Sequence, residues 1–201
     1  DVNTLTASYG HGIAVSPLQL VRATASIMNG GTLVTPTLIK QANLSKKDKK
    51  KAKLRHDVRV VSPQTSHRMR QLMRLVVTEG TGANADIDGF LVGGKTGTAE
   101  KPGKNGYDRK KLISSFLGVF PMDAPRYAVF VMVDEPQGTK ESFGYATGGW
   151  VAAPAVGRVI SGMASVMGLS PNKNDDRFEG SLLKHVKTKE QIKEERDIEA
   201  H

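Results

Sequence analysis

The spacing of apolar residues predicts three helices in this chain. The first begins at Ser16-Pro17, a pair typical of an N-cap followed by proline in the first turn, and ends at Gly30-Gly31. The second begins in the same way at Ser62-Pro63. The third covers Val151 to Met167, opens near Pro154, and has enough small residues to lie close on a sheet.

Three runs rich in β-branched and aromatic residues predict strands over Phe90 to Glu100, Leu112 to Phe120 and Tyr127 to Asp134. Their short links favour antiparallel pairing. Residues 102–111 and 136–149 are predicted to be loops near the ends of these strands. The expected fold class is therefore α+β, with part of an antiparallel sheet flanked by helices.

The remaining segments divide the chain into a folded region and a tail. Residues 1–12 are polar and contain glycine, which predicts a loop, whereas 32–39 predicts a short edge strand. We expect one domain over residues 1–168. Residues 169–201 are polar and charged and predict a mobile tail with a partial helix over 187–200.

Positive charge is concentrated in one segment. The net charge of +9 at first suggests a nucleic-acid or anionic-membrane partner. Residues 40–59 hold nine Lys or Arg residues against Asp48 and Asp57, and the rest of the chain is close to balanced. We interpret 43–57 as a solvated basic loop, with contact to an anionic surface as the alternative.

Composition limits the class of protein further. The 38% of hydrophobic and 24% of charged residues are ordinary for a globular domain. The sequence has no cysteine, which excludes disulfide and thiol chemistry, and no apolar run of about 18 residues. It begins at Asp1 without an initiator Met or a signal peptide, so we expect a piece of a longer protein whose membrane anchor lies elsewhere.

The richest stretch of candidate chemistry is Gly93-Gly94-Lys95-Thr96-Gly97-Thr98-Ala99. Strand side chains alternate between faces, so Thr96 and Thr98 should point one way and Lys95 the other. The two hydroxyls suit a carboxylate ligand, and Gly97 allows close approach. Lys95 can then act only around the strand edge or beneath the cleft floor, as a source of positive potential.

Further segments stand in order around this motif: Tyr9-Gly10-His11-Gly12, Ser16 to Leu20, Val77 to Gly82, Phe116 to Pro121, Val133 to Pro136, Gly148-Gly149 and Ala152 to Pro154. Lys-Thr-Gly is one of three motifs of penicillin-binding proteins and related β-lactamases. The ordered set resembles the C-terminal part of the transpeptidase domain of a class B penicillin-binding protein of the cell-division type. The resemblance spans residues 1 to about 168 and implies the penicillin-binding protein and serine β-lactamase fold.

The resemblance also implies a reaction. A nucleophilic Ser is acylated by the penultimate D-Ala of a peptidoglycan stem peptide and releases the last D-Ala, after which a neighbouring amine forms the cross-link. β-Lactams mimic the D-Ala-D-Ala end. By this likeness Lys95, Thr96, Gly97 and Thr98 bind the substrate or β-lactam carboxylate. Lys95 acts electrostatically, and the backbone N–H of Thr98 is one oxyanion donor.

Two departures from the family pattern matter. The Ser-x-x-Lys and Ser-x-Asn motifs should precede the Lys-Thr-Gly strand, but the matching text at Ser181 to Lys184 and Ser170 to Asn172 follows it. We interpret both as chance matches, so the nucleophilic Ser is expected to be absent and the fragment alone inactive. Ala146-Thr147 replace a frequent aromatic residue, which leaves Phe143 or Tyr145 to supply an aromatic wall.

No cofactor or metal site is expected, because the five His residues have no ligand spacing. His11 is interpreted as structural and Trp150 as a packing residue. Asp134-Glu135 resemble a carboxylate pair for acid–base chemistry, but neighbours in a strand face opposite sides, so we do not expect them to act as such a pair.

The function expected is that of the Lys-Thr-Gly lobe of a D,D-transpeptidase in septal cell-wall synthesis. A β-lactam sensor or serine β-lactamase of the same fold is one alternative, and a basic module binding an anionic surface is another. The expected partners are stem peptides, β-lactams, the missing N-terminal part of the domain and cell-division membrane proteins, with no nucleic acid. The expected location is the periplasmic side of the bacterial inner membrane.

Overall fold

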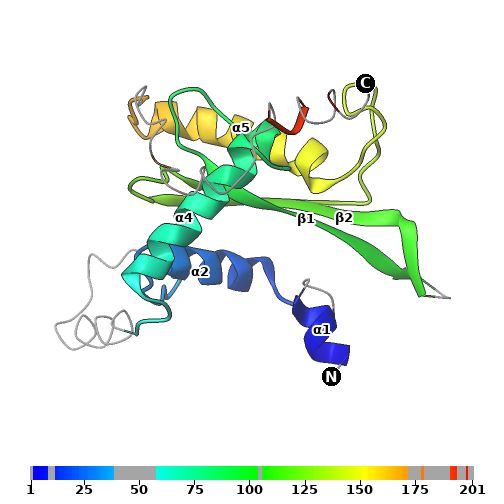
Figure 1. Cartoon of the computed structure of the whole chain (residues 1–201), viewed down its shortest axis with the longest axis horizontal. Coiled ribbons are helices and arrows are strands. Elements are labelled where there is room, and N and C mark those ends of the chain that lie inside the picture. The colour runs from blue at the N-terminus through cyan, green and yellow to red at the C-terminus, as the bar shows by residue number, and fades with distance from the viewer. Residues whose placement is uncertain are drawn as a thin grey trace.

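The computed structural model describes residues 2–8, 12–38, 58–103, 106–171, 178, 191–193 and 198 (Figure 1). The predicted basic loop 43–57 and most of the predicted tail 169–201 lie outside these residues. Within the tail, 191–193 and 198 are helical. No helix of the described part of the chain is both long enough and apolar enough to cross a membrane.

A three-stranded antiparallel sheet forms the centre of the molecule, in the order β1-β2-β3. The strands are β1 (Gly93–Gly103), β2 (Gly106–Phe120) and β3 (Tyr127–Asp134). The antiparallel prediction and the bounds of the third strand are therefore confirmed. The predicted loop 102–111 is wrong: β1 and β2 continue pairing past a register shift at Glu100/Lys101 and form a long hairpin. Its residues are mostly exposed, so no apolar alternation marked it in the sequence.

Side chains of β2 point alternately to the two faces of the sheet and contribute to a separate hydrophobic core on each face. Phe116 and Phe120 pack with Val156 and Ile160 of α5 (Gly148–Val166) on one face. Leu117 and Val119 belong to the opposite core. That core also contains Met28 of α2 (Pro17–Met28) and Met73 of α4 (Pro63–Thr78). Figure 1 shows α5 on one side of the sheet and α2 on the other, so β1 is reached by helices from both faces.

The helix starts follow the predicted capping chemistry. Ser16 and Gln19 form a reciprocal capping box at α2, and the Ser62 hydroxyl accepts from the Thr65 N–H at 3.0 Å. The third helix differs from its prediction, because α5 begins at Gly148 and Pro154 lies inside it. The sequence analysis treated the preceding glycine pair as loop, whereas it starts the helix where the backbone meets the sheet.

Two other segments contradict the sequence analysis. The predicted N-terminal loop contains α1 (Val2–Ser8), where the Ser8 hydroxyl donates to the Leu5 carbonyl. The predicted strand 32–39 is reduced to an isolated bridge between Thr32 and Arg59, and residue 39 lies outside the described residues. Among the described residues, the partner of this segment is 58–60, through the Leu33 N–H to the Val58 carbonyl and the Val60 N–H to the Gly31 carbonyl, both at 2.8 Å. The connector after α4 contains η2 (Ala83–Ala85).

Candidate active-site strand

The Lys-Thr-Gly motif lies on β1, at one edge of the described sheet. Thr98 accepts a hydrogen bond from the Gly148 N–H at 3.1 Å, at the start of α5. The Thr96 methyl group lies near Gly149 of the same helix. The two threonines therefore share the α5 side of the sheet, as strand alternation predicts.

Lys95 curls around its own strand. Its ammonium donates to the Thr96 carbonyl at 2.9 Å and approaches the Thr96 hydroxyl at 3.4 Å. Both the lysine and Thr98 are exposed, and Thr96 and Gly97 are half-buried. The Lys95 ammonium thus lies beside the Thr96 hydroxyl because the side chain reaches around the strand edge. Strand alternation left open both this route and a route beneath the cleft floor.

Thr81 completes this polar cluster from the connector after α4. Its hydroxyl lies 2.9 Å from the Thr96 hydroxyl. Nothing in the sequence signals this contact, since the two residues are fifteen positions apart and belong to different elements. Gly148 was also missed as a partner of Thr98, because only the packing of α5 on β1 brings its N–H there.

A cleft of about 540 Å³ lies beside the motif on the face that carries α2 and α4. Its lining combines the motif residues with apolar side chains that include Leu20, Met28, Met73, Leu117 and Phe130. The motif strand therefore has a polar cluster toward α5 and an apolar hollow on its opposite side.

The candidate aromatic residues gather on the loop that leads into α5. Phe143 and Tyr145 both contact Trp150, with ring centroids 5.6 and 6.0 Å apart. Their side chains are largely solvent-exposed, at 76% and 57%. Trp150 is thus a packing residue for these two rings. A wall role for Phe143 or Tyr145 remains an expectation from the family resemblance.

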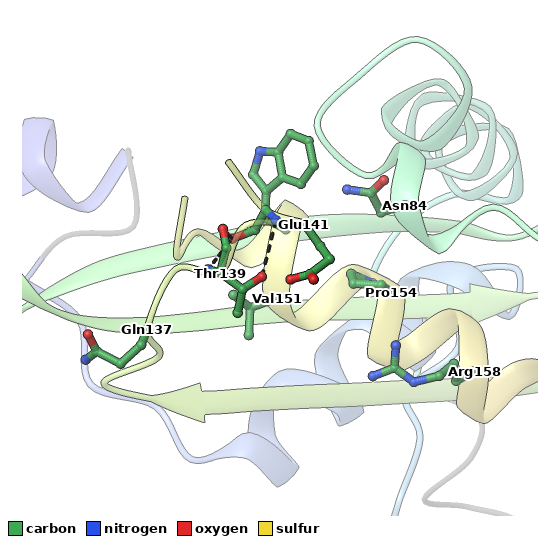
Figure 2. Close-up of a pocket in the computed structure, with 9 residues that line it drawn as sticks. Asn84, Gln137, Thr139, Glu141, Val151, Pro154 and Arg158 are labelled. Carbon is green, nitrogen blue, oxygen red and sulfur yellow. Dashed lines mark hydrogen bonds between the residues drawn. The ribbon is translucent and has the colours of Figure 1, made fainter. Parts of the chain in front are cut away.

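A second cleft, of about 490 Å³, lies between α5, η2 and the loop after β3 (Figure 2). Arg158 and Pro154 line it from the helix, and Glu141 and Thr139 line it from the loop. The Thr139 hydroxyl donates to the Glu141 carboxylate and holds the pKa of Glu141 below its usual range. The described lining contains no residue of the motif, so this cleft is separate from the motif cluster.

The Asp134 and Glu135 carboxylates share a partner, although strand alternation predicts that they face opposite sides. Glu135 follows the last residue of β3 and has a positive φ of 48°, so strand alternation no longer holds there. The Lys101 ammonium bonds Glu135 at 2.8 Å and Asp134 at 3.0 Å. The pair is therefore held in an ion cluster at the base of the β1–β2 hairpin.

The described residues contain no group of three or more His, Cys, Asp and Glu that could hold a metal ion. His67 packs edge-on against Phe178 at 5.9 Å, whereas His11 and His56 lie outside the described part. Ser170 is exposed, and Asn172, Ser181 and Lys184 lie outside the described residues.

Comparison with known proteins places this geometry in a family. Residues 1–161 match the family model of the penicillin binding protein transpeptidase domain. The chain is 41% identical over 179 residues to the probable peptidoglycan D,D-transpeptidase FtsI of Caulobacter vibrioides, covering 84% of this chain and 29% of that protein. It is also 41% identical over 175 residues to stage V sporulation protein D of Bacillus subtilis, covering 86% and 26%.

Solved structures agree with this match. The transpeptidase domain of penicillin-binding protein 3 from Burkholderia pseudomallei superposes with a TM-score of 0.72 and 36% identity, covering 85% of this chain and 48% of that domain. Penicillin-binding protein 3 of Mycobacterium tuberculosis, solved with ampicillin, superposes with a TM-score of 0.66 and 25% identity, covering 83% and 38%. The chain spans less than a third of the length of these curated relatives and about half of the solved domain.

Proposed function

Because the chain belongs to the penicillin-binding protein transpeptidase domain family, we propose that it supplies the carboxylate-binding wall of a peptidoglycan D,D-transpeptidase. The observation that carries this proposal is the β1 cluster, where Lys95 stands 3.4 Å from the Thr96 hydroxyl and Thr98 lies on the same side of the strand as Thr96. The nucleophilic Ser and its activating lysine belong to another part of the domain.

The cluster suits the terminal carboxylate of a D-Ala-D-Ala stem peptide or of a β-lactam. Threonine hydroxyls donate to an ionised carboxylate, which accepts only. A cation about 4 Å from such a carboxylate contributes roughly 4 kcal/mol at an effective dielectric of 20, offset in part by desolvation. Lys95 is exposed and close to the hydroxyls, so it supplies this potential without being buried.

The Thr98 backbone N–H acts in this proposal as one of two oxyanion donors. β1 is an edge strand, and a peptide lying along its free side can meet the backbone groups that face outward. N–H and C=O groups of alternate residues in a strand point to the same side, so the Thr98 N–H is directed like the Thr96 carbonyl that Lys95 reaches. Loss of one such donor costs roughly 3 kcal/mol in the transition state.

The reaction proposed for the complete protein is acyl transfer in septal cell-wall synthesis. It takes place outside the cytoplasm, on the periplasmic side of the inner membrane, with an anchor outside this chain. Its partners are stem peptides, the rest of the same domain and division proteins of the membrane. A β-lactam sensor and a serine β-lactamase of the same fold are the rivals. Rapid hydrolysis of penicillin by the complete protein would identify a β-lactamase, because a transpeptidase deacylates slowly.

The test is covalent labelling by a fluorescent penicillin. The complete transpeptidase domain, with this chain in place, should be labelled, whereas the 201-residue chain alone should not. Lys95→Ala in the complete domain should slow labelling, because it removes the cation beside Thr96. Stable labelling of the chain alone would refute the placement of the nucleophile, and an unchanged rate for Lys95→Ala would refute the assignment of the motif.

A further inference from the structure

Each threonine of the motif must point its single hydroxyl hydrogen at the ligand in order to bind a carboxylate. A hydroxyl has one hydrogen and two lone pairs, and an ionised carboxylate only accepts. Every other polar contact of the two hydroxyls must therefore come from a donor.

Thr98 meets the requirement through the backbone. The Gly148 N–H, which can only donate, fills a lone pair of the Thr98 hydroxyl at 3.1 Å. The hydrogen of Thr98 is then left for a ligand. The Lys95 ammonium is likewise only a donor, so its 3.4 Å contact with the Thr96 hydroxyl uses a lone pair and leaves the hydrogen free.

In the hydrogen bond between the Thr81 and Thr96 hydroxyls, the chemistry of the two groups does not set which one donates. The two hydroxyls lie 2.9 Å apart, and either can be the donor. If Thr96 donated to Thr81, its only hydrogen would be spent inside the protein. If Thr81 donates, Thr96 keeps its hydrogen for the ligand, and a charge-assisted bond to a carboxylate favours that direction because it is the stronger bond.

The position of Thr81 is fixed by close packing. Its carbonyl oxygen lies so near Gly149 that a Cβ on that glycine would stand 2.3 Å away. The next residue, Gly82, donates its N–H to the Val76 carbonyl at 2.8 Å and lies against the Phe116 ring. Asn84 donates to the Gly149 carbonyl at 2.9 Å. The backbone at Thr81 is therefore positioned by packing of the connector, and its hydroxyl contacts Thr96.

We propose that Thr81 is a positioning residue that donates to the Thr96 hydroxyl and so directs the Thr96 hydrogen at the ligand carboxylate. The inference rests on the proposed function. Together with the Gly148 N–H at Thr98, it makes the two threonines a preorganised pair of donors. Thr81 itself need not touch the ligand.

The experiment measures the rate of acylation of the complete transpeptidase domain by benzylpenicillin and by its methyl ester. Thr81→Val should lower the rate with the carboxylate by up to about tenfold, the size of one lost hydrogen bond between neutral groups, and change the rate with the ester far less. Thr81→Ser keeps the hydroxyl and should retain most of the rate. Thr65→Val is the matched control, because it removes a hydroxyl contact of the same 2.9 Å length, with Ser62, at the opposite end of α4 from Thr81.

The double variant Thr81→Val with Thr96→Val should be no slower than Thr96→Val alone, since the first residue acts through the second. Additive losses, or an equal loss for the ester and the carboxylate, would overturn the positioning role. The ratio of the two rates is unaffected by partial unfolding. A wild-type domain that neither compound acylates would refute the proposed function, whereas an acylated domain whose Thr81→Val variant keeps its rate refutes only this inference.

Discussion

Lys95 and Arg74 are two cations with different roles. Lys95 is available to a ligand, whereas Arg74 stabilises the fold. Lys95 is exposed, and its ammonium contacts only Thr96 among the bonds described here, so it remains available to an anionic ligand. The side chain of Arg74 is only 13% exposed and joins Asp86 at 2.7 Å and the Val92 carbonyl at 2.8 Å. It ties α4 and the connector to the residues that lead into β1.

Arg74→Met should therefore destabilise the fold. The substitution keeps an apolar stem but leaves the Val92 carbonyl, in a fully buried residue, without this donor. We expect a loss of about 1–3 kcal/mol in the free energy of unfolding, measured by urea denaturation. Arg68→Met, at an exposed position of the same helix, is the control and should change the stability little. Equal stabilities of the two variants would show that the buried bonds of Arg74 contribute nothing.

Among the elements, the start of α5 is the one that packs against the motif strand and supplies a hydrogen-bond donor to Thr98. Gly148 enters the helix where a Cβ would stand 2.3 Å from the Ser115 carbonyl oxygen and 2.6 Å from that of Gly97. Only glycine allows the helix backbone this close to β1 and β2, and the approach brings the Gly148 N–H to Thr98. The glycine pair is thus part of the site through its backbone.

Gly148→Ala should push α5 away from β1. We expect strong destabilisation, together with slower β-lactam acylation of the complete domain, because the contact to Thr98 is lost. Gly162→Ala in the same helix is the matched control: a Cβ there meets nothing within 4 Å, and the change should stabilise the fold by about 0.5–1 kcal/mol. Thermal unfolding and acylation rates measure both, and a Gly148→Ala variant as stable as wild type would contradict the packing.

The β1–β2 hairpin is held at its base by Lys101. Hydrogen bonds to the Glu135 and Asp134 carboxylates raise the pKa of Lys101 above its ordinary value of 10.5. A raised pKa of a basic group means that its contribution to stability is complete below 10.5 and is lost as the pH rises through the higher folded value. The melting temperatures of wild type and Lys101→Met should therefore differ at neutral pH and converge above this range. A difference that persists there would exclude the ion cluster as its cause.

At the scale of the whole molecule, the described part of the chain leaves an apolar cleft beside the motif and unpaired sheet edges. Other parts of a larger domain can pack against such surfaces. The cleft brings Leu20, Met69 and Phe130 to the side opposite α5. Both β1 and β3 are edges of the described sheet. The chain covers about half of a solved transpeptidase domain, so we expect the rest of the domain to meet the apolar cleft and the β3 edge, with the β1 edge left open for the substrate.

The isolated chain should therefore bind a hydrophobic dye such as ANS and self-associate as its concentration rises. Joining it to the rest of the domain should suppress both effects, because the apolar cleft and the β3 edge become covered. Dye fluorescence and analytical ultracentrifugation of the two proteins measure this. A monomeric chain that binds no dye would show that the surfaces are closed without the rest of the domain.

Features that depend on local chemistry follow from the sequence alone. Ser16 and Ser62 start helices because their hydroxyls cap nearby N–H groups, and Tyr127 to Asp134 forms a strand within the predicted bounds. The polar hairpin at 102–111 was not predictable from periodicity, since its faces are mostly exposed and alternation reports only burial.

Tertiary structure alone decided which groups surround the motif. The sequence placed Lys95, Thr96 and Thr98 on one strand, with the threonines on a common face. It could not bring Thr81 to Thr96 or Gly148 to Thr98, because these contacts join segments fifteen and fifty positions apart. Such contacts exist only after α5 and the connector pack on the sheet. Local sequence therefore specifies the residues of the motif strand, and long-range packing specifies which groups contact their hydroxyls.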